Sequence, residues 1–139
     1  MQIFIREAKT DDLETLYKVE LECFGLESFT RAQLAYFLEA PRFVSLVAEV
    51  NGNIAGFIIG SVESYFDNEI HGHIYTLDVS QKYRRKGVAS KLIEEVEKIF
   101  VANGAETCHL EVRTGNIAAL RLYKKHGYVI TETLKDYYK

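Results

Sequence analysis

Four consecutive residues of unusual character stand directly before a helical stretch in the second half of the chain. Arg84, Arg85 and Lys86 are followed by Gly87, and residues 88–100 repeat apolar side chains with the 3.6-residue period of an amphipathic helix. The first amide groups of a helix lack partners within it, and the helix dipole is positive at that end. A glycine there lets an anion approach the backbone, and neighbouring cations strengthen the attraction. These residues predict a site for a phosphate-bearing ligand. The alternative is a solvated basic turn that caps the helix.

The basic segment differs from the common phosphate-binding loops. A P-loop requires Gly-x-x-x-x-Gly-Lys-Ser/Thr and a dinucleotide-binding turn requires three glycines, whereas this segment has one glycine and three cations. It follows the run Ile-Tyr-Thr-Leu-Asp-Val, which is typical of a strand buried on both faces. Its spacing is Arg84-x-x-Gly87-x-Ala89, between this strand and the helix.

Three further polar side chains, Glu111, Asn116 and Tyr123, could carry chemistry near the end of the chain. A carboxylate can accept a proton, and a tyrosine hydroxyl can donate a hydrogen bond or a proton. Each also has an ordinary alternative. A strand glutamate usually faces solvent, an asparagine after glycine is usually a turn residue, and a tyrosine beside leucines is usually part of a core.

Taken together, these motifs resemble the GNAT superfamily of N-acetyltransferases. The spacing Arg84-x-x-Gly87-x-Ala89 is similar to its acetyl-CoA pyrophosphate loop. The second half is similar to the RimI-like branch, which acetylates protein N-terminal amines, through the motifs Leu110-Glu111-Val112-Arg113, Asn116, Ala119, Leu122-Tyr123 and Gly127-Tyr128. The resemblance covers most of the chain and implies the acyl-CoA N-acyltransferase fold, with acetyl-CoA as the acetyl donor and no metal.

The resemblance implies a set of residues that bind acetyl-CoA. The backbone of one strand would pair with the pantetheine arm as an added strand pairs with a sheet edge. The following loop and helix start would hold the pyrophosphate, and two later side chains would contact the cofactor further along. The strand residues are Leu77, Asp78 and Val79, the loop and helix residues are Arg84, Arg85, Lys86, Gly87, Val88, Ala89 and Ser90, and the later ones are Asn116 and Tyr123.

The resemblance also implies two catalytic roles. Glu111 would be the general base, acting through water, and Tyr123 the general acid toward the leaving thiolate. An N-terminal amine has a pKa of roughly 7.7–8.0, so part of it is already neutral at pH 7. A tyrosine near pKa 10 would give its proton to a thiol near 8.5 at a cost of roughly 2 kcal/mol. Stabilisation of the thiolate by a hydrogen bond is therefore an alternative role for Tyr123.

The resemblance implies that two segments and one predicted strand of this chain bind the acceptor. The loop at residues 26–30, with Leu26 and Phe29, and the pair Tyr137-Tyr138 would cover the acceptor. Strand alternation places His73 and Tyr75 on one face, and some related enzymes have a catalytic aromatic residue where His73 stands. The loop has Glu-Ser-Phe where the branch often has Pro-Trp, which argues against strict specificity for ribosomal proteins.

The histidines and cysteines do not predict a metal centre or a covalent intermediate. His71, His73, His109 and His126 lie on different predicted elements without the spacing of metal ligands. Two cysteines, Cys23 and Cys108, make no disulfide framework, fall outside the motifs, and are expected to be small buried residues in a reducing compartment.

The elements that must position these residues follow from periodicity and from local turn signals. Asn51-Gly52 predicts a hairpin, Thr30 with Gln33 a capping box, and Thr10, Asp11 and Asp12 a capped helix start. Gly56 and Gly60 within one predicted strand indicate a bulge or a close backbone approach. Strands are expected at 2–6, 43–50, 54–63, 71–79, 106–113 and 128–134, and helices at 10–24, 30–40, 88–103 and 117–125. The order β-α-α-β-β-β-α-β-α-β predicts an α/β (α+β) fold with a mixed sheet and helices on both faces, which is the order of the GNAT fold. That fold normally continues into a final strand, and the chain stops at Lys139 without it, so either the sequence is truncated or a sheet edge is open.

Length and composition set further bounds. We expect 139 residues, with 47% hydrophobic and 27% charged residues, to form one domain over 1–139. The formal net charge of −3 argues against nucleic-acid binding, and no apolar run is long enough for a membrane span or a signal segment. We therefore expect a cytoplasmic protein. The sequence does not determine its number of subunits, and a dimer is one alternative.

The sequence thus predicts an acetyl-CoA-dependent N-acetyltransferase that works by direct attack in a ternary complex. The expected acceptor is the N-terminal α-amine of a protein or peptide. Alternatives are acetyl transfer to a lysine or a small-molecule amine, a non-catalytic acyl-CoA-binding module, and a nucleotide-binding regulator.

Overall fold

A computed structural model describes residues 1–64, 68–110, 112 and 117–128 of the chain. Its described strands are β1 (Phe4–Glu7), β2 (Phe43–Val50), β3 (Asn53–Ser64), β4 (Ile70–Val79) and β5 (Thr107–Leu110). Its described helices are α1 (Leu13–Phe24), α2 (Arg31–Glu39), α3 (Val88–Ala102) and α4 (Ile117–Lys125), with short 3₁₀ turns at Thr10–Asp12, Gly25–Glu27 and Gln81–Tyr83.

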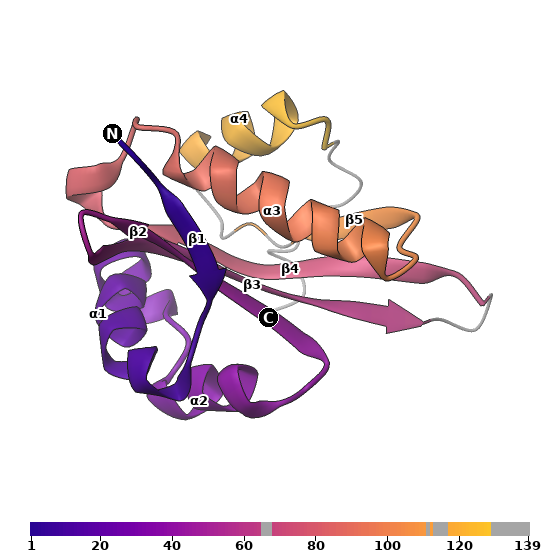
Figure 1. Cartoon of the computed structure of the whole chain (residues 1–139), viewed down its shortest axis with the longest axis horizontal. Coiled ribbons are helices and arrows are strands. Elements are labelled where there is room, and N and C mark those ends of the chain that lie inside the picture. The colour runs from indigo at the N-terminus through magenta and orange to yellow at the C-terminus, as the bar shows by residue number, and fades with distance from the viewer. Residues whose placement is uncertain (65–67, 111, 113–116, 129–139) are drawn as a thin grey trace.

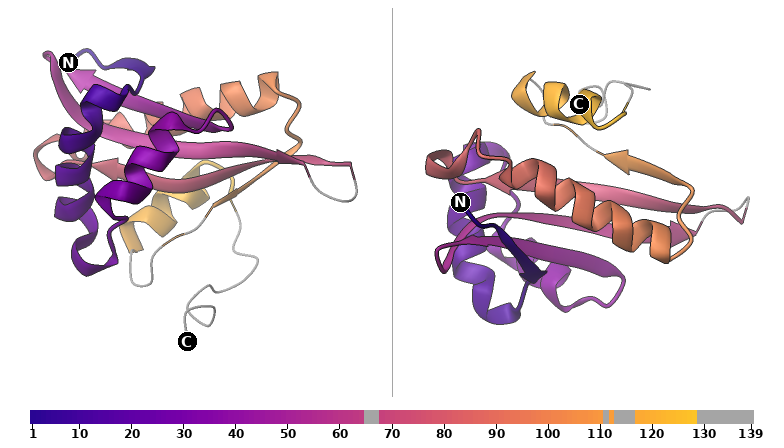
Figure 2. Two further views of the ribbon diagram at one scale, coloured as in Figure 1. Left: turned by 90° about the horizontal axis from the view of Figure 1, so that it is seen from below. Right: turned by 45° about the horizontal axis from the view of Figure 1, so that its top comes forward.

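The five described strands form one mixed sheet in the order β1-β2-β3-β4-β5. The first four pair antiparallel, and β5 pairs parallel to β4 after the crossover through α3. Helices α1 and α2 cover one face, and α3 covers the other (Figure 1). Helix α4 lies on the same side of the sheet as α3 (Figure 2). The predicted mixed sheet with helices on both faces is confirmed.

Each face of the sheet has its own apolar core. On one face, strand residues pack with the buried stripe of α3, which consists of Val88, Leu92, Ile93, Val96 and Phe100. On the other face, Val47, Phe57 and Ile59 pack against α1 and α2. Because α3 buries five side chains on the sheet, its first turn is held rigidly where a ligand would meet it.

Turn signals that the sequence carries locally are confirmed. Asn51 and Gly52 both have positive φ, of 53° and 80°, and join β2 to β3 as the two central residues of a tight hairpin. Thr30 and Gln33 form the expected capping box of α2, with Gln33 N–H donating to Thr30 Oγ1 at 3.1 Å and Thr30 N–H to Gln33 Oε1 at 2.8 Å.

Gly56 and Gly60 of β3 lie where a neighbouring backbone or ring approaches closely, as their position in a strand predicts. A Cβ at Gly60 would lie 2.6 Å from the carbonyl oxygen of His73 and 2.7 Å from Phe100 Cζ, and a Cβ at Gly56 would meet the carbonyl oxygen of Asp78. The β3–β4 register shifts between Ile59 and Gly60, so that Tyr75 is the extra residue on β4. This bulge changes which β4 side chains share a face.

Several predicted boundaries need correction. The first helix begins with a 3₁₀ turn at Thr10–Asp12, and the α-helix proper starts at Leu13. The side chain of Asp12, rather than that of Thr10, accepts a backbone hydrogen bond there, from Lys9 N–H at 2.7 Å. The described part of the fifth strand covers Thr107–Leu110 within the predicted 106–113. Apart from Tyr128, the strand expected at 128–134 lies outside the described residues.

Helix α4 has the predicted bounds, and Gly127 caps its end with φ 92°. Among the helices that the structure describes, none combines the length and apolar character needed to cross a membrane.

Candidate active site

The basic segment lies at the N-terminus of α3, directly after the end of β4. Gly87 is the N-cap residue with φ 86°, and Arg85 also has a left-handed backbone, with φ 62°. A Cβ built on Gly87 would meet nothing within 4 Å, so the approach to the first turn of α3 is open. Among the described residues, no side chain caps this helix start, and the amides of a first helical turn need external acceptors. The geometry fits the diphosphate of a CoA-type ligand.

The three cations of this segment are all exposed, but they are not equivalent. The guanidinium of Arg84 turns back onto the protein, with Nε donating to the carbonyl oxygen of Val79 at 3.0 Å and Nη2 lying 3.5 Å from Cys23 Sγ. Arg84 therefore fixes the end of β4 to the end of α1. Arg85 and Lys86 are the two cations better placed to meet an anion by charge alone.

The start of α3 is joined to α4 on the same side of the sheet. Val88 is buried, Ala89 and Ser90 are half-buried, and Ser90 Oγ lies 3.1 Å from His126 Nε2. The predicted pyrophosphate residues at the helix start are thus supported by His126, which directly follows α4, the helix that carries Tyr123.

Strand β4 is paired along its whole length on one side and only partly on the other. Residues Gly56–Ser64 of β3 pair with it, whereas the described β5 pairs only with His71–Ile74. From Tyr75 onward, the second edge of β4 has no partner strand among the described residues. The predicted pantetheine residues Leu77, Asp78 and Val79 lie on this stretch, although the Val79 carbonyl already accepts from Arg84.

Tyr123 lies on α4 and is 5% exposed, packed in the core on the α3 side of the sheet. Its ring meets that of Tyr128 edge-on, with centroids 5.7 Å apart. The other two predicted residues of this half, Glu111 and Asn116, lie outside the described residues, as does Tyr137. Their geometry relative to Tyr123 stays a prediction.

The opposite face of the sheet carries the residues predicted to meet the acceptor. The rings of His73 and Tyr75 lie 4.4 Å apart, which confirms that they share a face. Tyr75 stacks on Phe37 of α2 at 5.6 Å, and Phe37 meets Phe29 of the α1–α2 connection edge-on at 5.2 Å. An aromatic row thus runs from this connection to β4. Leu26 lies apart from the row and is fully exposed.

The Tyr75 hydroxyl is held by polar groups of β3. It donates to Glu63 Oε2 at 2.7 Å, and Ser61 Oγ lies 3.0 Å from the same carboxylate and 3.3 Å from the hydroxyl. Burial raises the pKa of Tyr75, and the Glu63 carboxylate adds to that direction against the Ser61 hydrogen bond. Tyr75 is therefore a neutral hydroxyl at physiological pH.

Sequence reasoning missed Glu20, a carboxylate of α1 that is fully buried beside the sheet. Its Oε2 accepts from Phe29 N–H at 2.8 Å, and its Oε1 lies 3.3 Å from Thr76 Oγ1. A signal was present, because Glu20 follows Leu16 by four residues and so falls on the apolar stripe of the helix. A charged residue on such a stripe needs buried partners.

Two of the four histidines come together, although they lie on different strands. His71 of β4 and His109 of β5 stack at 5.0 Å, with Nδ1 and Nε2 2.9 Å apart, and Thr107 Oγ1 lies 2.5 Å from His71 Nδ1. Within the described residues, no group of three or more His, Cys, Asp or Glu side chains could hold a metal ion.

Neither cysteine has the environment of a nucleophile. Burial, with a smaller effect of the Asp78 charge, raises the pKa of Cys23 to about 11. Burial likewise raises the pKa of Cys108 to about 11. Both thiols are half-buried rather than fully buried, and both are largely protonated at neutral pH.

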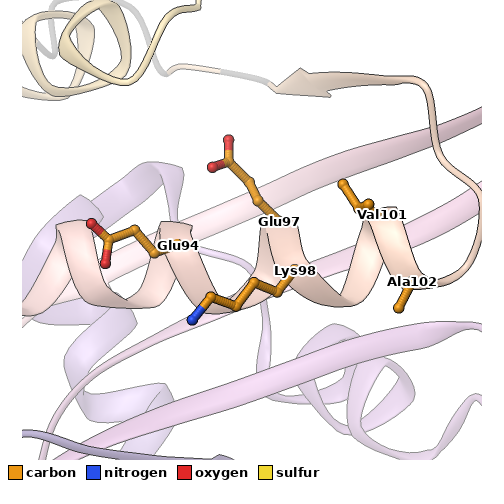
Figure 3. A pocket seen from close by; sticks show the side chains of 5 residues that line it. All are labelled: Glu94, Glu97, Lys98, Val101 and Ala102. Atoms are coloured by element: carbon orange, nitrogen blue, oxygen red, sulfur yellow. The ribbon is translucent and has the colours of Figure 1, made fainter.

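A shallow depression lies along the outer face of α3, lined by Glu94, Glu97, Lys98, Val101 and Ala102 (Figure 3). These residues run from the middle of the helix to its C-terminal end. Because the basic segment is at the other end of α3, the depression does not coincide with the candidate site.

Comparison with known proteins decides the family. The model of the acetyltransferase (GNAT) family matches residues 11–128, which include every element from α1 to α4. The chain belongs to the GNAT acetyltransferase family.

Two curated relatives and one solved structure place the chain more closely. It is 32% identical over 136 residues to the N-alpha-acetyltransferase daf-31 of Caenorhabditis elegans, covering 96% of this chain and 75% of the relative. It is 32% identical over 141 residues to NAA10 of Arabidopsis thaliana, described as the catalytic subunit of the N-terminal acetyltransferase A complex, covering 98% of this chain and 71% of the relative.

The solved structure is the ribosomal-protein-S18-alanine N-acetyltransferase from Escherichia coli. It matches with a TM-score of 0.78 and 26% identity, covering 91% of this chain and 77% of that one. The chain is therefore an acetyl-CoA-dependent N-acetyltransferase with the GNAT fold, as the sequence motifs predicted.

Proposed function

We propose that this chain acetylates the N-terminal α-amine of proteins or peptides, in the cytoplasm, by direct attack of the amine in a ternary complex. The observation that carries the proposal is the 32% identity, over nearly the whole chain, to two enzymes named for that acceptor. The similarity to an enzyme that acetylates an alanine of a ribosomal protein supports the same class of acceptor.

In this proposal the acetyl-CoA site runs from β4 to the start of α3. Backbone groups of Leu77 and Asp78 pair with the pantetheine arm along the edge of β4 that no described strand covers. The amides of residues 85–90 hold the pyrophosphate, with Arg85 and Lys86 adding charge. Arg84 acts by fixing the loop to Val79, and Asn116 contacts the cofactor further along.

Two residues carry the proton movements in the proposal. Acetyl-CoA supplies an acetyl thioester, whose carbonyl carbon accepts the amine nitrogen as the bond to sulfur breaks. Glu111 accepts the amine proton through water, and Tyr123 hydrogen-bonds to the sulfur that leaves. The burial of Tyr123 supports this role, because a hydroxyl in a low-dielectric setting stabilises charge more strongly than one in water.

The acceptor enters, in this proposal, on the face that carries the aromatic row. Phe29 and Tyr75 line the approach, His73 lies beside the amine, and Leu26 and Tyr137 cover it from the rim. The neutral hydroxyl of Tyr75 can accept a hydrogen bond from the amine while it donates to Glu63.

The test is thiol release from acetyl-CoA with a mixed peptide library, with product masses read in parallel. We expect acetyl groups on α-amines of particular peptides and none on the same peptides with a blocked N-terminus that keep a free lysine. Acetylation of lysine side chains only, or of small-molecule amines only, would contradict the proposed acceptor. CoA binding without thiol release from any acceptor would contradict turnover itself and favour a binding module.

A further inference from the structure

The last two turns of α1 reach two loops that lie on either side of the candidate site. One is the α1–α2 connection, residues 25–30, which we call the acceptor loop. The other connects β4 to α3, residues 80–87, which we call the pyrophosphate loop. Helix α1 packs under the sheet beside α2 (Figure 1), and its carboxylates Glu20 and Glu22 each bond to one of these loops.

Glu20 holds the acceptor loop by two hydrogen bonds. Its side chain accepts from Phe29 N–H at 2.8 Å, and its own carbonyl oxygen accepts from Ser28 Oγ at 3.1 Å. On the other side its carboxylate faces Thr76 of β4, whose hydroxyl lies 2.6 Å from Asp78 Oδ1. One buried carboxylate therefore ties the loop that carries Phe29 to the strand that carries Tyr75.

Glu22 holds the pyrophosphate loop. Its Oε2 accepts from Gln81 N–H at 2.5 Å, and its two oxygens lie 3.1 and 3.3 Å from Ser80 Oγ. These contacts place a negative charge at the start of the 3₁₀ turn Gln81–Tyr83, where the exposed N–H groups favour it. Cys23, the next residue, is bonded to Val79 and Arg84 of the same region.

In the described contacts, the two carboxylates bond to different loops. Glu20 contacts residues of the acceptor loop and β4, and Glu22 contacts residues of the pyrophosphate loop. Neither lies among the residues that our proposed function places against acetyl-CoA or the acceptor. Because a helix is stiff over two turns, each loop is held to the same rigid reference.

We infer that Glu20 and Glu22 are positioning residues with separate duties. Glu20 sets the acceptor loop for binding of the acceptor amine, and Glu22 sets the pyrophosphate loop for binding of acetyl-CoA. The inference rests on the proposed function for the identity of the acceptor, but not for the binding of CoA.

The experiment compares Glu20→Met, Glu20→Gln and Glu22→Ala with the wild type. Acceptor KM is measured at saturating acetyl-CoA, and the Kd for CoA is measured by calorimetry. Glu20→Met removes a bond to a charged group, so we expect acceptor KM to rise about tenfold with the CoA Kd within about twofold. Glu20→Gln keeps an oxygen for Phe29 N–H and gains a donor for Thr76, so we expect it to restore acceptor KM.

Glu22→Ala should give the reverse pattern. Its contacts are exposed, so we expect a smaller effect, with the CoA Kd rising about threefold to fivefold and acceptor KM unchanged. Glu14→Gln is the matched control, because Glu14 lies on the same helix and pairs only with the exposed Arg31 in the described contacts. Neither constant should change in that variant.

The inference is supported if Glu20→Met raises only acceptor KM and Glu22→Ala raises only the Kd for CoA. If both variants raise both constants together, or if neither constant changes, α1 has only a general structural role and the inference is wrong. Should Glu20→Met fail to fold, Ser28→Ala removes the loop's other contact to Glu20 without disturbing the core, and a rise in acceptor KM alone is again the expected result.

Two readouts do not need turnover. Calorimetry with CoA tests the Glu22 assignment even if no acceptor is found. Hydrogen exchange of the Phe29 amide tests the Glu20 assignment in the same way, since we expect faster exchange in Glu20→Met and wild-type protection in Glu20→Gln. Unchanged protection of that amide in Glu20→Met would overturn the assignment, whatever the fate of the proposed function.

Discussion

At the scale of single residues, the candidate site separates groups by what they can do at neutral pH. Tyr123 is a buried hydroxyl in the α3-side core, and Tyr75 is a hydroxyl held neutral on the opposite face beside His73. Both cysteine thiols have a raised pKa. The described residues therefore supply hydrogen-bond donors and acceptors for direct transfer, and they supply no thiolate for a covalent route.

Replacing Tyr123 by phenylalanine tests its proposed hydrogen bond to the leaving sulfur. We expect kcat to fall about tenfold or more, while the Kd for CoA stays within about twofold, because the ring still fills its place in the core. Steady-state kinetics and calorimetry measure the two quantities. Tyr128→Phe is the matched control, since its ring meets that of Tyr123 but its hydroxyl donates to Glu97. An unchanged kcat in Tyr123→Phe would remove that role.

The two thiols give a second prediction at this scale. With a pKa of about 11, on the order of one thiol in a thousand is ionised at pH 8, against about a quarter for a free cysteine. We expect iodoacetamide to label Cys23 and Cys108 at least a hundredfold more slowly in the native protein than in urea, as read by mass spectrometry. Labelling of either within minutes, together with loss of activity, would instead indicate a thiolate at the site.

At the scale of elements, β1 and α1 are tied by a charged pair that stabilises the N-terminal part of the fold. Arg6 donates from Nη1 to Asp12 Oδ2 at 2.9 Å and from Nε to Glu49 Oε2 at 2.8 Å. The guanidinium holds the pKa of Asp12 below its usual range. This contact fixes the start of α1, whose other end holds both loops of the site.

Asp12→Asn should lower the free energy of unfolding by about 1 kcal/mol at pH 7, a modest value because Arg6 is partly exposed. Since the pKa of Asp12 is lowered by folding, its contribution is present above the unfolded pKa of about 3.9 and is lost as pH falls through the folded pKa. Urea unfolding at pH 7 and pH 2.5 should show a smaller difference from the wild type at pH 2.5 than at pH 7. Asp11→Asn, on the same turn, is the control; a pH-independent deficit in Asp12→Asn would contradict the charge-based explanation.

Elements whose signals lie within a few neighbouring residues could be predicted from the sequence, and features that depend on residues far apart in the chain could not. The capping box at Thr30 and the hairpin at Asn51-Gly52 need only a few neighbouring residues, and both predictions are confirmed. The family motif is likewise local, with Gly87 at its helix start. The burial of Glu20 was signalled by its place on the apolar stripe of α1, but its partner Thr76 was not predictable, because it lies 56 residues away in sequence.

The same distance dependence explains the histidines. Their positions in sequence indicated separate elements, which is correct, yet His71 and His109 touch because of the β4–β5 register. Register between strands joined by a long crossover follows from the packing of α3 on both, and no short stretch of sequence encodes it. The bulge at Tyr75 is similar, since it depends on the close approach of Gly60 to His73.

At the scale of the whole molecule, an acidic protein is proposed to bind an anionic substrate. The formal net charge is −3, so attraction of CoA must come from the local field at the start of α3 rather than from the overall charge. That field comes from the N-terminus of α3 together with Arg85 and Lys86. A ligand held there binds the helix whose buried stripe forms one of the two apolar cores. Binding at this place should therefore stabilise the entire fold.

The double variant Arg85→Ala/Lys86→Ala tests this local field. In the wild type, CoA at a hundred times its Kd should add about 2.7 kcal/mol of stability and raise Tm by on the order of 8 °C. In the double variant we expect an unchanged Tm without CoA, because both side chains are exposed, and a much smaller rise at the same CoA concentration. Scanning calorimetry at 50 and 300 mM salt should show the rise shrinking with salt in the wild type more than in the variant.

The matched control for that experiment is Lys9→Ala/Lys18→Ala, which removes the same two charges from exposed positions near and on α1. Both double variants bring the formal net charge from −3 to −5, since each removes two cations. If CoA binding follows the local field, only the variant at residues 85 and 86 loses the stabilisation. An equal loss in both would mean that total charge governs the encounter, and a loss in neither would assign the pyrophosphate to the backbone amides of α3 alone.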